Sequence, residues 1–351
     1  MPDGPSGQAR EVAVFRHNLF RISETFITQQ AGQLGRYRPL YVGRLRQGEG
    51  PAGADSRVLG DLGGIWKWPR IGLQMLTRDP APYVRLLTGR RPALIHAHFG
   101  VEGVYAMPVA KRLGIPLVTT FHGFDATLST GALLSSPAWA NYPLFRGQLA
   151  LQGDLFLCAS SFIRERVLAM GFPEARTRIH YIGVDCGTIR PRDPAEETRT
   201  VLHVARLVEV KGTRHLICAF ARVARRVPDV DLAIVGDGPL KATLQSQAAA
   251  LGIGGRVRFL GARPYPEVLG LMRTAAMLVL PSVRASDGRV EGLGMVLLEA
   301  AATGVPTIGS RIGGIPEGVL DGETGFLVPE RDEEGLAARI EALLEDRTMR
   351  L

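Results

Sequence analysis

The segment with the clearest chemical potential is residues 291–299, which read Glu-Gly-Leu-Gly-Met-Val-Leu-Leu-Glu. It follows an apolar run that predicts a buried strand, so a helix should begin here. Gly292 and Gly294 leave backbone N–H groups accessible at that helix start, which suits a phosphate or sugar hydroxyls. On a helix, Glu291 and Glu299 would lie about 80° apart in rotation and about 12 Å apart along the axis. This spacing matches the two ends of a nucleotide sugar, although a helix-terminal Glu and a solvated Glu would give the same pattern.

Two cations follow another predicted strand. Arg206 and Lys211 lie five residues apart just before a predicted helix. A forked guanidinium and a compact ammonium together suit a diphosphate, although two solvated loop cations are common. A further buried strand enters a Gly-rich turn at Gly236, which alone is a weak signal for nucleotide contact. Asp229 and Asp231 match the Asp-X-Asp pattern of metal-dependent transferases, but we interpret them as the polar start of a strand at Asp231.

The first half of the chain carries polar side chains at the ends of predicted strands. His122 follows a strand and precedes a glycine, a position that favours a cleft, so we predict a functional role for it. We interpret His96 and His98 as structural, because no partner ligands lie at metal-binding spacing. Ser23 and Glu24 follow the first strand and open a predicted helix. Either Ser23 is the N-cap of that helix, or the helix N-terminus faces the cleft.

Short apolar runs alternate with helical stretches, which is typical of doubly wound parallel sheets. The predicted strands cover residues 11–15, 94–98, 117–121, 154–159 and 178–182 in the first half, and 200–205, 231–235, 257–260, 277–281 and 307–309 in the second. Residues 183–197 combine prolines with a run of charge and read as a linker. We therefore expect an α/β fold of two Rossmann-like domains, residues 1–190 and 191–351, whose sheets face each other across a ligand-binding cleft.

The bulk composition limits the class of protein. A chain of 351 residues suits two domains, and 22% charged with 46% hydrophobic residues is a globular composition. The sequence has no apolar run of about 18 residues and no apolar core of a signal peptide near its start. Cys158, Cys186 and Cys218 are scattered and form no Cys-X-X-Cys pair. Disulfides and a zinc site are therefore not expected, and we predict a cytoplasmic protein.

The net charge of +8 is unevenly distributed. Residues 1–192 hold 23 Lys and Arg against 13 Asp and Glu, a net charge of +10, whereas residues 193–351 hold 19 against 21, a net charge of −2. The basic half should therefore meet an anionic partner: membrane lipid, a lipid-linked phosphate or nucleic acid. Solvated surface arginines are the alternative explanation.

A second feature of the basic half bears on the membrane. Residues 47–61 are rich in Gly, Pro and Ala and predict a loose loop. Behind it, Trp66 and Trp68 flank Lys67 beside Arg70. Tryptophans among cations are typical of an interfacial membrane contact, and the core packing of a helix explains them equally well.

Taken together, these segments resemble glycosyltransferase family 4, the retaining enzymes of the GT-B fold. The resemblance covers almost the whole chain and rests on the order of its motifs. These are Ser23-Glu-Thr-Phe26, His122-Gly-Phe-Asp125, Tyr181-Ile-Gly-Val-Asp185, Arg206 with Lys211, Gly236-Asp-Gly-Pro239, Glu291 to Glu299, Gly313-Gly-Ile-Pro-Glu317 and Gly322-Glu-Thr-Gly-Phe-Leu327. The Ser-Glu-Thr-Phe start is similar to the bacterial exopolysaccharide branch of the colanic-acid type.

The resemblance implies the following roles. Arg206 and Lys211 would bind the diphosphate, Glu299 the ribose and Glu291 the donor sugar, with His122 near the reacting centre. The remaining donor-binding residues would be Gly236, Gly292, Leu293 and Gly294, and the acceptor or cleft residues Ser23, Glu24, His98 and Asp125. The implied reaction is retaining hexosyl transfer from a nucleotide diphosphate sugar, UDP-sugars favoured, to a glycan or lipid-linked glycan at the inner face of the membrane. It would need no metal and no other cofactor.

The sequence departs from the family in two places. Residues 18–23 contain no glycine, whereas many family members have a Gly-Gly loop after the first strand that touches the donor phosphates. The sequence also stops at Leu351, whereas family members usually continue through a last helix that crosses back to the first domain.

Other functions remain open from the residues. A related glycosyltransferase could act on a small soluble acceptor of the natural-product type, and a non-hydrolysing nucleotide-sugar epimerase would use carboxylates and histidine as acid and base. The pI of about 9.8 also suggests nucleic-acid binding. No aromatic residues interleave with the basic ones in a recognisable motif, so we do not expect a nucleic-acid partner.

Overall fold

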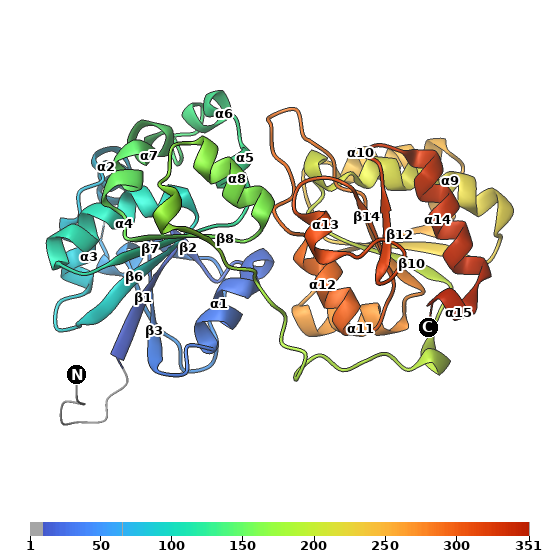
Figure 1. The fold of residues 1–351 in the computed structure, drawn as a ribbon, viewed down its shortest axis with the longest axis horizontal. Coiled ribbons are helices and arrows are strands. Elements are labelled where there is room, and N and C mark those ends of the chain that lie inside the picture. The colour runs from blue at the N-terminus through green and yellow to red at the C-terminus, as the bar shows by residue number, and fades with distance from the viewer. Residues whose placement is uncertain (1–9, 65, 351) are drawn as a thin grey trace. The chain divides into compact units, whose positions relative to one another are not determined.

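The computed structural model describes residues 10–64 and 66–350. Within this part the chain divides into two compact units. Unit 1 contains residues 10–159 and 163–180 and runs from blue to green in Figure 1, and unit 2 contains residues 160–162 and 181–350 and ends in red. Each unit contains one large parallel sheet with helices packed on it. The fold class predicted from the sequence, two Rossmann-like α/β units, is confirmed.

The sheet of unit 1 has seven strands in the order β5-β3-β1-β6-β7-β8-β9, all paired in parallel. The strands are β1 Arg10–Phe15, β3 Tyr37–Gly43, β5 Asp55–Val58, β6 Pro92–His98, β7 Leu117–Phe121, β8 Leu155–Cys158 and β9 Thr177–Ile179, with a separate pair β2 Asn18–Leu19 and β4 Leu45–Arg46. The helices are η1 Ile22–Glu24, α1 Thr25–Gly32, η2 Leu59–Leu62, α2 Lys67–Thr77, α3 Ala81–Leu86, α4 Gly100–Leu113, α5 Phe124–Thr127, α6 Thr130–Leu134, α7 Asn141–Gln152, α8 Ser161–Ala169 and η3 Glu174–Arg176.

The sheet of unit 2 has six strands in the order β12-β11-β10-β13-β14-β15, again parallel. They are β10 Thr200–Val204, β11 Asp231–Val235, β12 Val257–Gly261, β13 Met277–Leu280, β14 Thr307–Ser310 and β15 Gly325–Val328. The helices are η4 Pro194–Glu196, η5 Glu209–Lys211, α9 Thr213–Arg226, α10 Lys241–Ala250, η6 Gly254–Arg256, α11 Tyr265–Thr274, α12 Met295–Ala302, α13 Ile315–Gly318, α14 Glu333–Glu345 and α15 Arg347–Arg350.

Apolar periodicity explains how the helices of unit 2 pack. Leu216, Phe220 and Val223 of α9 recur at spacings of four and three residues and are fully buried. That stripe faces the core and packs with β11 and α14, whose Ile340 and Leu344 belong to the same cluster. Burial of such a stripe, at about 25 cal/mol per Å² of apolar surface, is the main term that holds helix to sheet.

The ten predicted strands are all present, and five further strands of the described residues were missed: β3, β5, β15 and the two-residue strands β2 and β4. The predicted loose loop over residues 47–61 is present in residues 47–54, but the prediction is wrong beyond them. The range also contains all of β5, whose polar sequence Asp-Ser-Arg-Val pairs with β3 at the sheet edge. Asp231 does begin a strand, as predicted. Asp229 and Asp231 form surface ion pairs with arginines rather than a paired carboxylate site. None of the helices within residues 10–64 and 66–350 is long and apolar enough to cross a bilayer.

Candidate functional site

The loop between β13 and α12 carries the most concentrated polar chemistry of unit 2. The Glu291 carboxylate accepts hydrogen bonds from Lys211 Nζ at 2.5 Å and from Ser282 Oγ at 3.3 Å. The charged side chains are only 20% exposed for Lys211 and 14% for Glu291, so water screens this ion pair weakly. Lys211 and Glu291 were both predicted for the donor site, and the structure joins them directly. Ser282 was missed, although it follows the strand that leads into this loop.

Gly313 and Gly314 pack closely against the loop that carries Glu291. Gly313 has φ +59°, and a Cβ on it would lie 2.1 Å from the carbonyl oxygen of Glu291. Gly314 N donates to that same oxygen at 3.1 Å, and a Cβ on Gly314 would lie 1.9 Å from the carbonyl oxygen of Gly292. The Gly-Gly pair of this motif is therefore required by the close approach of two loops, which fixes the position of Glu291.

Helix α12 begins directly after this loop and carries the second predicted carboxylate. Gly294 is its N-cap, and Leu293 before it is buried. Glu299 lies on α12, where burial raises the pKa of its carboxyl to about 7, although a hydrogen bond with Tyr265 opposes the shift. Near neutral pH this carboxyl can therefore exist in both protonation states. Tyr265 was not predicted, and it belongs to α11, far from Glu299 in the sequence.

The remaining predicted donor residues follow neighbouring strands. Arg206 is exposed after β10, and Gly236 follows β11. A Cβ on Gly236 would lie 1.9 Å from the carbonyl oxygen of Ala205, so only glycine lets these two strand ends approach so closely. Because β11, β10 and β13 are neighbours in the sheet, the segments that carry Arg206, Gly236, Lys211 and Glu291 all follow the carboxyl edge of one sheet. In open α/β sheets this edge is where ligands bind.

In unit 1, three histidines lie at the carboxyl ends of β6 and β7. His98 Nδ1 and His122 Nε2 are 3.0 Å apart, and His96 Nε2 is 2.7 Å from Thr120 Oγ1. Burial lowers the pKa of His122 to about 3 and that of His96 to about 4, and it lowers the pKa of His98 well below its usual value. All three are therefore neutral at pH 7. Within the described residues, His122 Nδ1 is buried and has no hydrogen-bond partner.

Asp125 organises the loop that holds His122. Its carboxylate accepts from the backbone N–H groups of Gly100 at 2.8 Å, Gly123 at 2.9 Å and His122 at 3.2 Å. Burial raises the pKa of Asp125 to about 6, although these three N–H groups counteract the shift. The structure therefore places Asp125 under the loop, where it fixes the backbone of His122.

Of the two interpretations offered for Ser23, the one that makes it the N-cap of the helix is wrong. Ser23 is exposed inside the 3-10 turn η1, and α1 starts at Thr25 with no side-chain capping bond. Glu24 instead receives two hydrogen bonds from Arg16, from Nε at 2.8 Å and from Nη2 at 2.9 Å, and Arg16 also pairs with Glu102. Burial would raise the pKa of Glu102, but Arg16 and His17 outweigh it and lower that pKa to about 2. The sequence did offer a signal for Arg16, a cation placed directly after β1.

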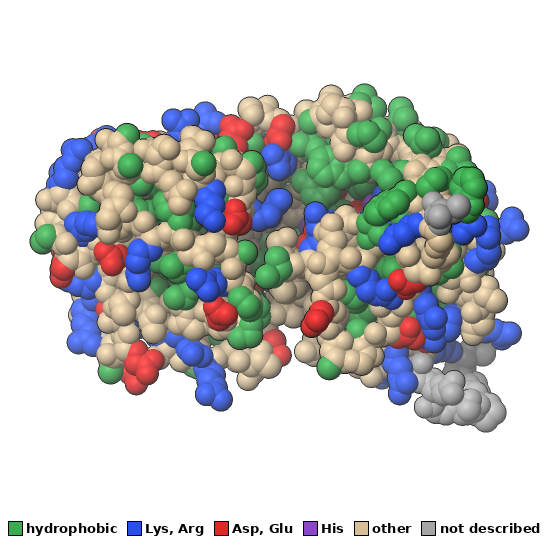
Figure 2. Space-filling model, turned by 180° about the vertical axis from the view of Figure 1, so that it is seen from behind, with side chains coloured by type: hydrophobic (Ala, Val, Ile, Leu, Met, Phe, Trp, Pro, Cys, Tyr) green, Lys and Arg blue, Asp and Glu red, His purple; other side chains and the backbone are tan. Residues whose placement is uncertain are grey.

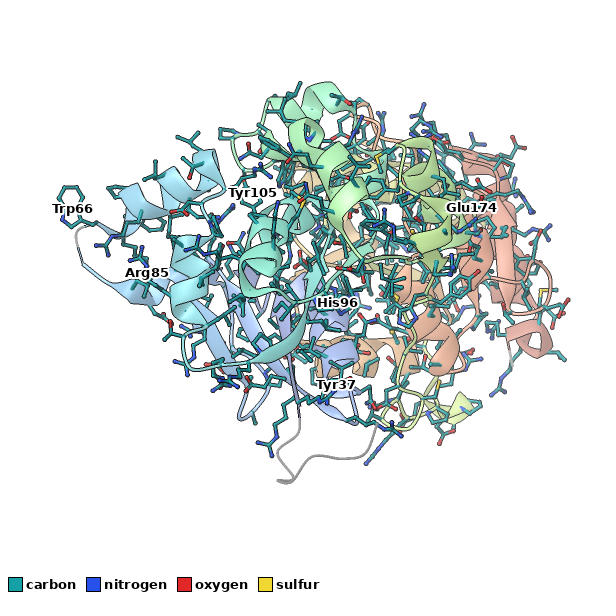
Figure 3. The ribbon with its side chains drawn as sticks, turned by 60° about the vertical axis from the view of Figure 1, so that its left-hand side comes forward. Tyr37, Trp66, Arg85, His96, Tyr105 and Glu174 are labelled. Atoms are coloured by element: carbon teal, nitrogen blue, oxygen red, sulfur yellow. The ribbon has the colours of Figure 1, made fainter. Side chains whose placement is uncertain are left out.

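Two cavities lie near these elements. A cavity of about 260 Å³ in unit 1 lies beside α1, is lined mainly by apolar side chains and includes His96 and His98. Figure 3 shows His96 in the middle of the unit, with Tyr37, another lining residue, below it. A shallow groove of about 410 Å³ in unit 2 lies between β12 and α11 and is lined by Arg258, Arg263 and Glu267, among others. Of the predicted site residues, only His98 lines either space.

Comparisons with known proteins cover most of the chain. Residues 188–351 match the family described as glycosyl transferases group 1, and residues 41–188 match glycosyltransferase family 4. WcaL of Escherichia coli, a glycosyltransferase assigned to colanic acid biosynthesis, is 33% identical over 74% of this chain and 63% of its own length. A GDP-mannose-dependent α-(1-6)-phosphatidylinositol monomannoside mannosyltransferase of Mycolicibacterium smegmatis is 34% identical over 71% of this chain and 66% of its own length. The matched region thus spans less than two thirds of each of these relatives.

Solved structures support the same architecture. Alr3699/HepE of Anabaena, crystallised with UDP and glucose, superposes with a TM-score of 0.75 at 21% identity. The superposition covers 97% of this chain and 91% of the HepE chain. Sucrose-phosphate synthase of Thermosynechococcus elongatus superposes equally well, with a TM-score of 0.75 at 20% identity, over 97% of this chain and 91% of its own.

Proposed function

Because this chain belongs to the family 4 glycosyltransferases of the GT-B fold, we propose that it transfers a sugar from a nucleotide diphosphate sugar to a glycan or lipid-linked glycan in polysaccharide biosynthesis, with retention of configuration. The observation that carries the proposal is the group at the carboxyl edge of the unit 2 sheet. The ion pair between Lys211 and Glu291 is largely shielded from solvent, and Glu291 belongs to the loop that leads into α12. Glu299 lies on α12 itself.

The proposed donor site assigns one part of the donor to each group. The diphosphate replaces Glu291 as the counter-ion of Lys211 and also forms an ion pair with Arg206. The Glu299 carboxylate accepts hydrogen bonds from the ribose hydroxyls. Backbone at Gly236, Gly292, Leu293 and Gly294 completes the donor contacts. When the bond from the sugar C1 to the diphosphate breaks, negative charge grows on the departing diphosphate, and fixed cations stabilise it most where water is excluded. The acceptor oxygen bonds to C1, and its proton passes to the diphosphate.

The identity of donor and acceptor rests on the relatives. The superposed HepE structure contains UDP, which favours a UDP-sugar, whereas the mycobacterial relative is named for GDP-mannose. The WcaL relative is assigned to an exopolysaccharide and the mycobacterial relative to a phosphatidylinositol mannoside, so both a glycan and a lipid-linked glycan remain within the proposed acceptor class. A small soluble acceptor is the alternative, because a further relative, from Bacillus anthracis, is named N-acetyl-α-D-glucosaminyl L-malate synthase.

Unit 1 is assigned to the acceptor and to the reacting centre. The free Nδ1 of neutral His122 supports a hydrogen bond to a sugar oxygen there, and Asp125 keeps its loop in place. Ser23, Glu24 and His98 are proposed for the acceptor side. In this scheme Lys211 and Arg206 provide the cationic charge for the diphosphate, so the reaction is proposed to need no metal ion.

Donor hydrolysis tests the proposal without a known acceptor. When water replaces the acceptor, ¹H NMR identifies which anomer of the free sugar is released first. We expect the anomer of the donor to appear first and then to mutarotate. Initial release of the opposite anomer would overturn retention, and conversion of the donor sugar into its epimer without release would favour the epimerase alternative.

A further inference from the structure

Helix α2 is attached to unit 1 through one face only. That face buries Ile71 and Gln74, and Arg44 Nε donates to Gln74 Oε1 at 3.1 Å. The carbonyl oxygen of Met75 accepts from Tyr105 OH at 2.9 Å. These contacts hold the helix in place, so the side chains on its opposite face are free for another role.

That opposite face is apolar and exposed. Trp68, Leu73 and Leu76 are 64%, 60% and 76% exposed, and on a helix they fall within an arc of about 140°. Trp66, just before the helix, is 61% exposed, and Figure 3 shows it projecting away from the body of unit 1. Core packing, one of the two explanations offered for the tryptophans, is therefore wrong. A cluster of large exposed apolar side chains marks an interaction surface, whereas single ones need no explanation.

The same segment is strongly basic. Residues 67–91 contain six Lys and Arg and a single acidic residue, Asp79. Arg70, Arg85 and Arg91 are exposed. Figure 2 shows hydrophobic side chains gathered over the part of unit 1 that carries α2, with Lys and Arg among and around them. The surface therefore offers apolar insertion and positive charge together.

We propose that the α2 face, defined as Trp66, Trp68, Leu73 and Leu76, docks on an anionic lipid bilayer with α2 lying in the plane of the interface. Tryptophan prefers the headgroup level, where its ring is half in apolar and half in polar surroundings. An amphipathic helix of this kind inserts its apolar face by about 5–10 Å, and neighbouring cations attract anionic headgroups. The inference rests on the proposed function for its purpose, because docking would bring unit 1 to a lipid-linked acceptor.

Vesicle co-sedimentation of the full chain tests the docking surface directly. The probes are vesicles of phosphatidylcholine alone and of phosphatidylcholine with 30% phosphatidylglycerol, each at about 0.1 M and about 1 M NaCl, where the Debye length is about 10 Å and about 3 Å. We expect binding only to the anionic vesicles, with a several-fold loss at high salt. The double variant Trp68→Ser, Leu76→Ser should bind at least tenfold less. Leu320→Ser, which changes a leucine of unit 2 that is 58% exposed, should bind as the unchanged protein does.

A second measurement covers the case in which the double variant fails to fold. The chain has three tryptophans, so Trp139→Phe leaves Trp66 and Trp68 as the only emitters. Their fluorescence should shift to the blue on anionic vesicles and should be quenched by brominated lipid. The proposal is overturned if the unchanged protein stays in the supernatant with anionic vesicles at 0.1 M salt, if brominated lipid leaves the emission unquenched, or if the folded double variant binds normally. It is also overturned if the unchanged protein is a dimer, the double variant is a monomer and neither protein binds vesicles, because the α2 face would then be a contact between two copies of the chain. None of these experiments uses a sugar nucleotide. Failure of the docking proposal therefore leaves the transferase proposal unaffected, and failure of the transferase proposal leaves the docking proposal unaffected.

Discussion

Replacing Glu291 by Gln should separate donor binding from turnover. Glu291 accepts a hydrogen bond from Lys211 Nζ at 2.5 Å, and both side chains are largely buried. Before Lys211 can bind a diphosphate, it must give up this charge-assisted contact, worth roughly 1.5–3 kcal/mol. In Glu291→Gln that cost is smaller, because a neutral amide replaces the carboxylate.

The magnitude follows from this exchange. The new contact between Lys211 and the diphosphate forms in both proteins and cancels, so the gain is the difference between the charged contact, roughly 1.5–3 kcal/mol, and the neutral amide contact that replaces it, roughly 0.5–1.5 kcal/mol. The variant therefore gains about 1.4 kcal/mol in nucleotide binding, which is a factor of about ten in Kd. We therefore expect the Kd of the nucleoside diphosphate to stay constant or to fall by up to about tenfold. Turnover should fall by about ten- to a hundredfold, because the variant loses the carboxylate assigned to the donor sugar.

Two further variants make the comparison specific. Glu299→Gln removes the carboxylate assigned to the ribose and should raise the Kd by about tenfold. Glu209→Gln is the matched control: it removes one negative charge two residues before Lys211, from an exposed side chain bonded to Ser286. Isothermal titration with the nucleoside diphosphate and initial rates with the donor sugar give both quantities. The reasoning is refuted if Glu291→Gln weakens nucleotide binding as much as Glu299→Gln, or if the control variant behaves like Glu291→Gln.

Three other expectations follow from the same site. Arg206→Ala and Lys211→Ala each remove one charge-assisted diphosphate contact, so each should lose about ten- to a hundredfold in kcat/KM, and normal kinetics in both would remove these cations from the site. The pKa of Glu299 is raised to about 7, so its carboxylate form is reached only as pH rises through that value. Nucleotide binding, followed calorimetrically from pH 5.5 to 8.5, should tighten more steeply with rising pH in the unchanged protein than in Glu299→Gln, which keeps only the titration of the terminal phosphate of the ligand, with a second pKa of about 6. Equal slopes in the two proteins would contradict the assignment. Prolonged treatment with EDTA should leave donor turnover unchanged, and a loss that Mg²⁺ or Mn²⁺ restores would show that the reaction needs a metal.

The sequence predicted the parallel sheets well because their central strands are buried on both faces and read as continuous apolar runs. Strand β5 escaped prediction because its residues Asp-Ser-Arg-Val carry no such run, and its extended conformation comes from pairing with β3. Register and edge pairing are tertiary effects, which local sequence does not encode.

The sequence could predict those residues of the candidate site whose positions follow from the order of the strands in the sheet. Residues that follow neighbouring strands converge at one sheet edge, which is why Lys211 and Glu291 were both predicted for a donor site. Their direct ion pair was not predictable, because it joins side chains 80 residues apart whose rotamers depend on packing. The contact of Arg16 with Glu24 and Glu102 escaped for the same reason.

The most direct test of the central claim is the release of free nucleoside diphosphate from a panel of UDP-, GDP- and dTDP-sugars, with a bacterial glycolipid extract as acceptor. We expect turnover with one nucleotide class, a UDP-sugar first, and a loss of at least tenfold for Lys211→Ala on that same donor. No release above the enzyme-free rate from any donor, or rates equal in the unchanged protein and in Lys211→Ala, would contradict the account.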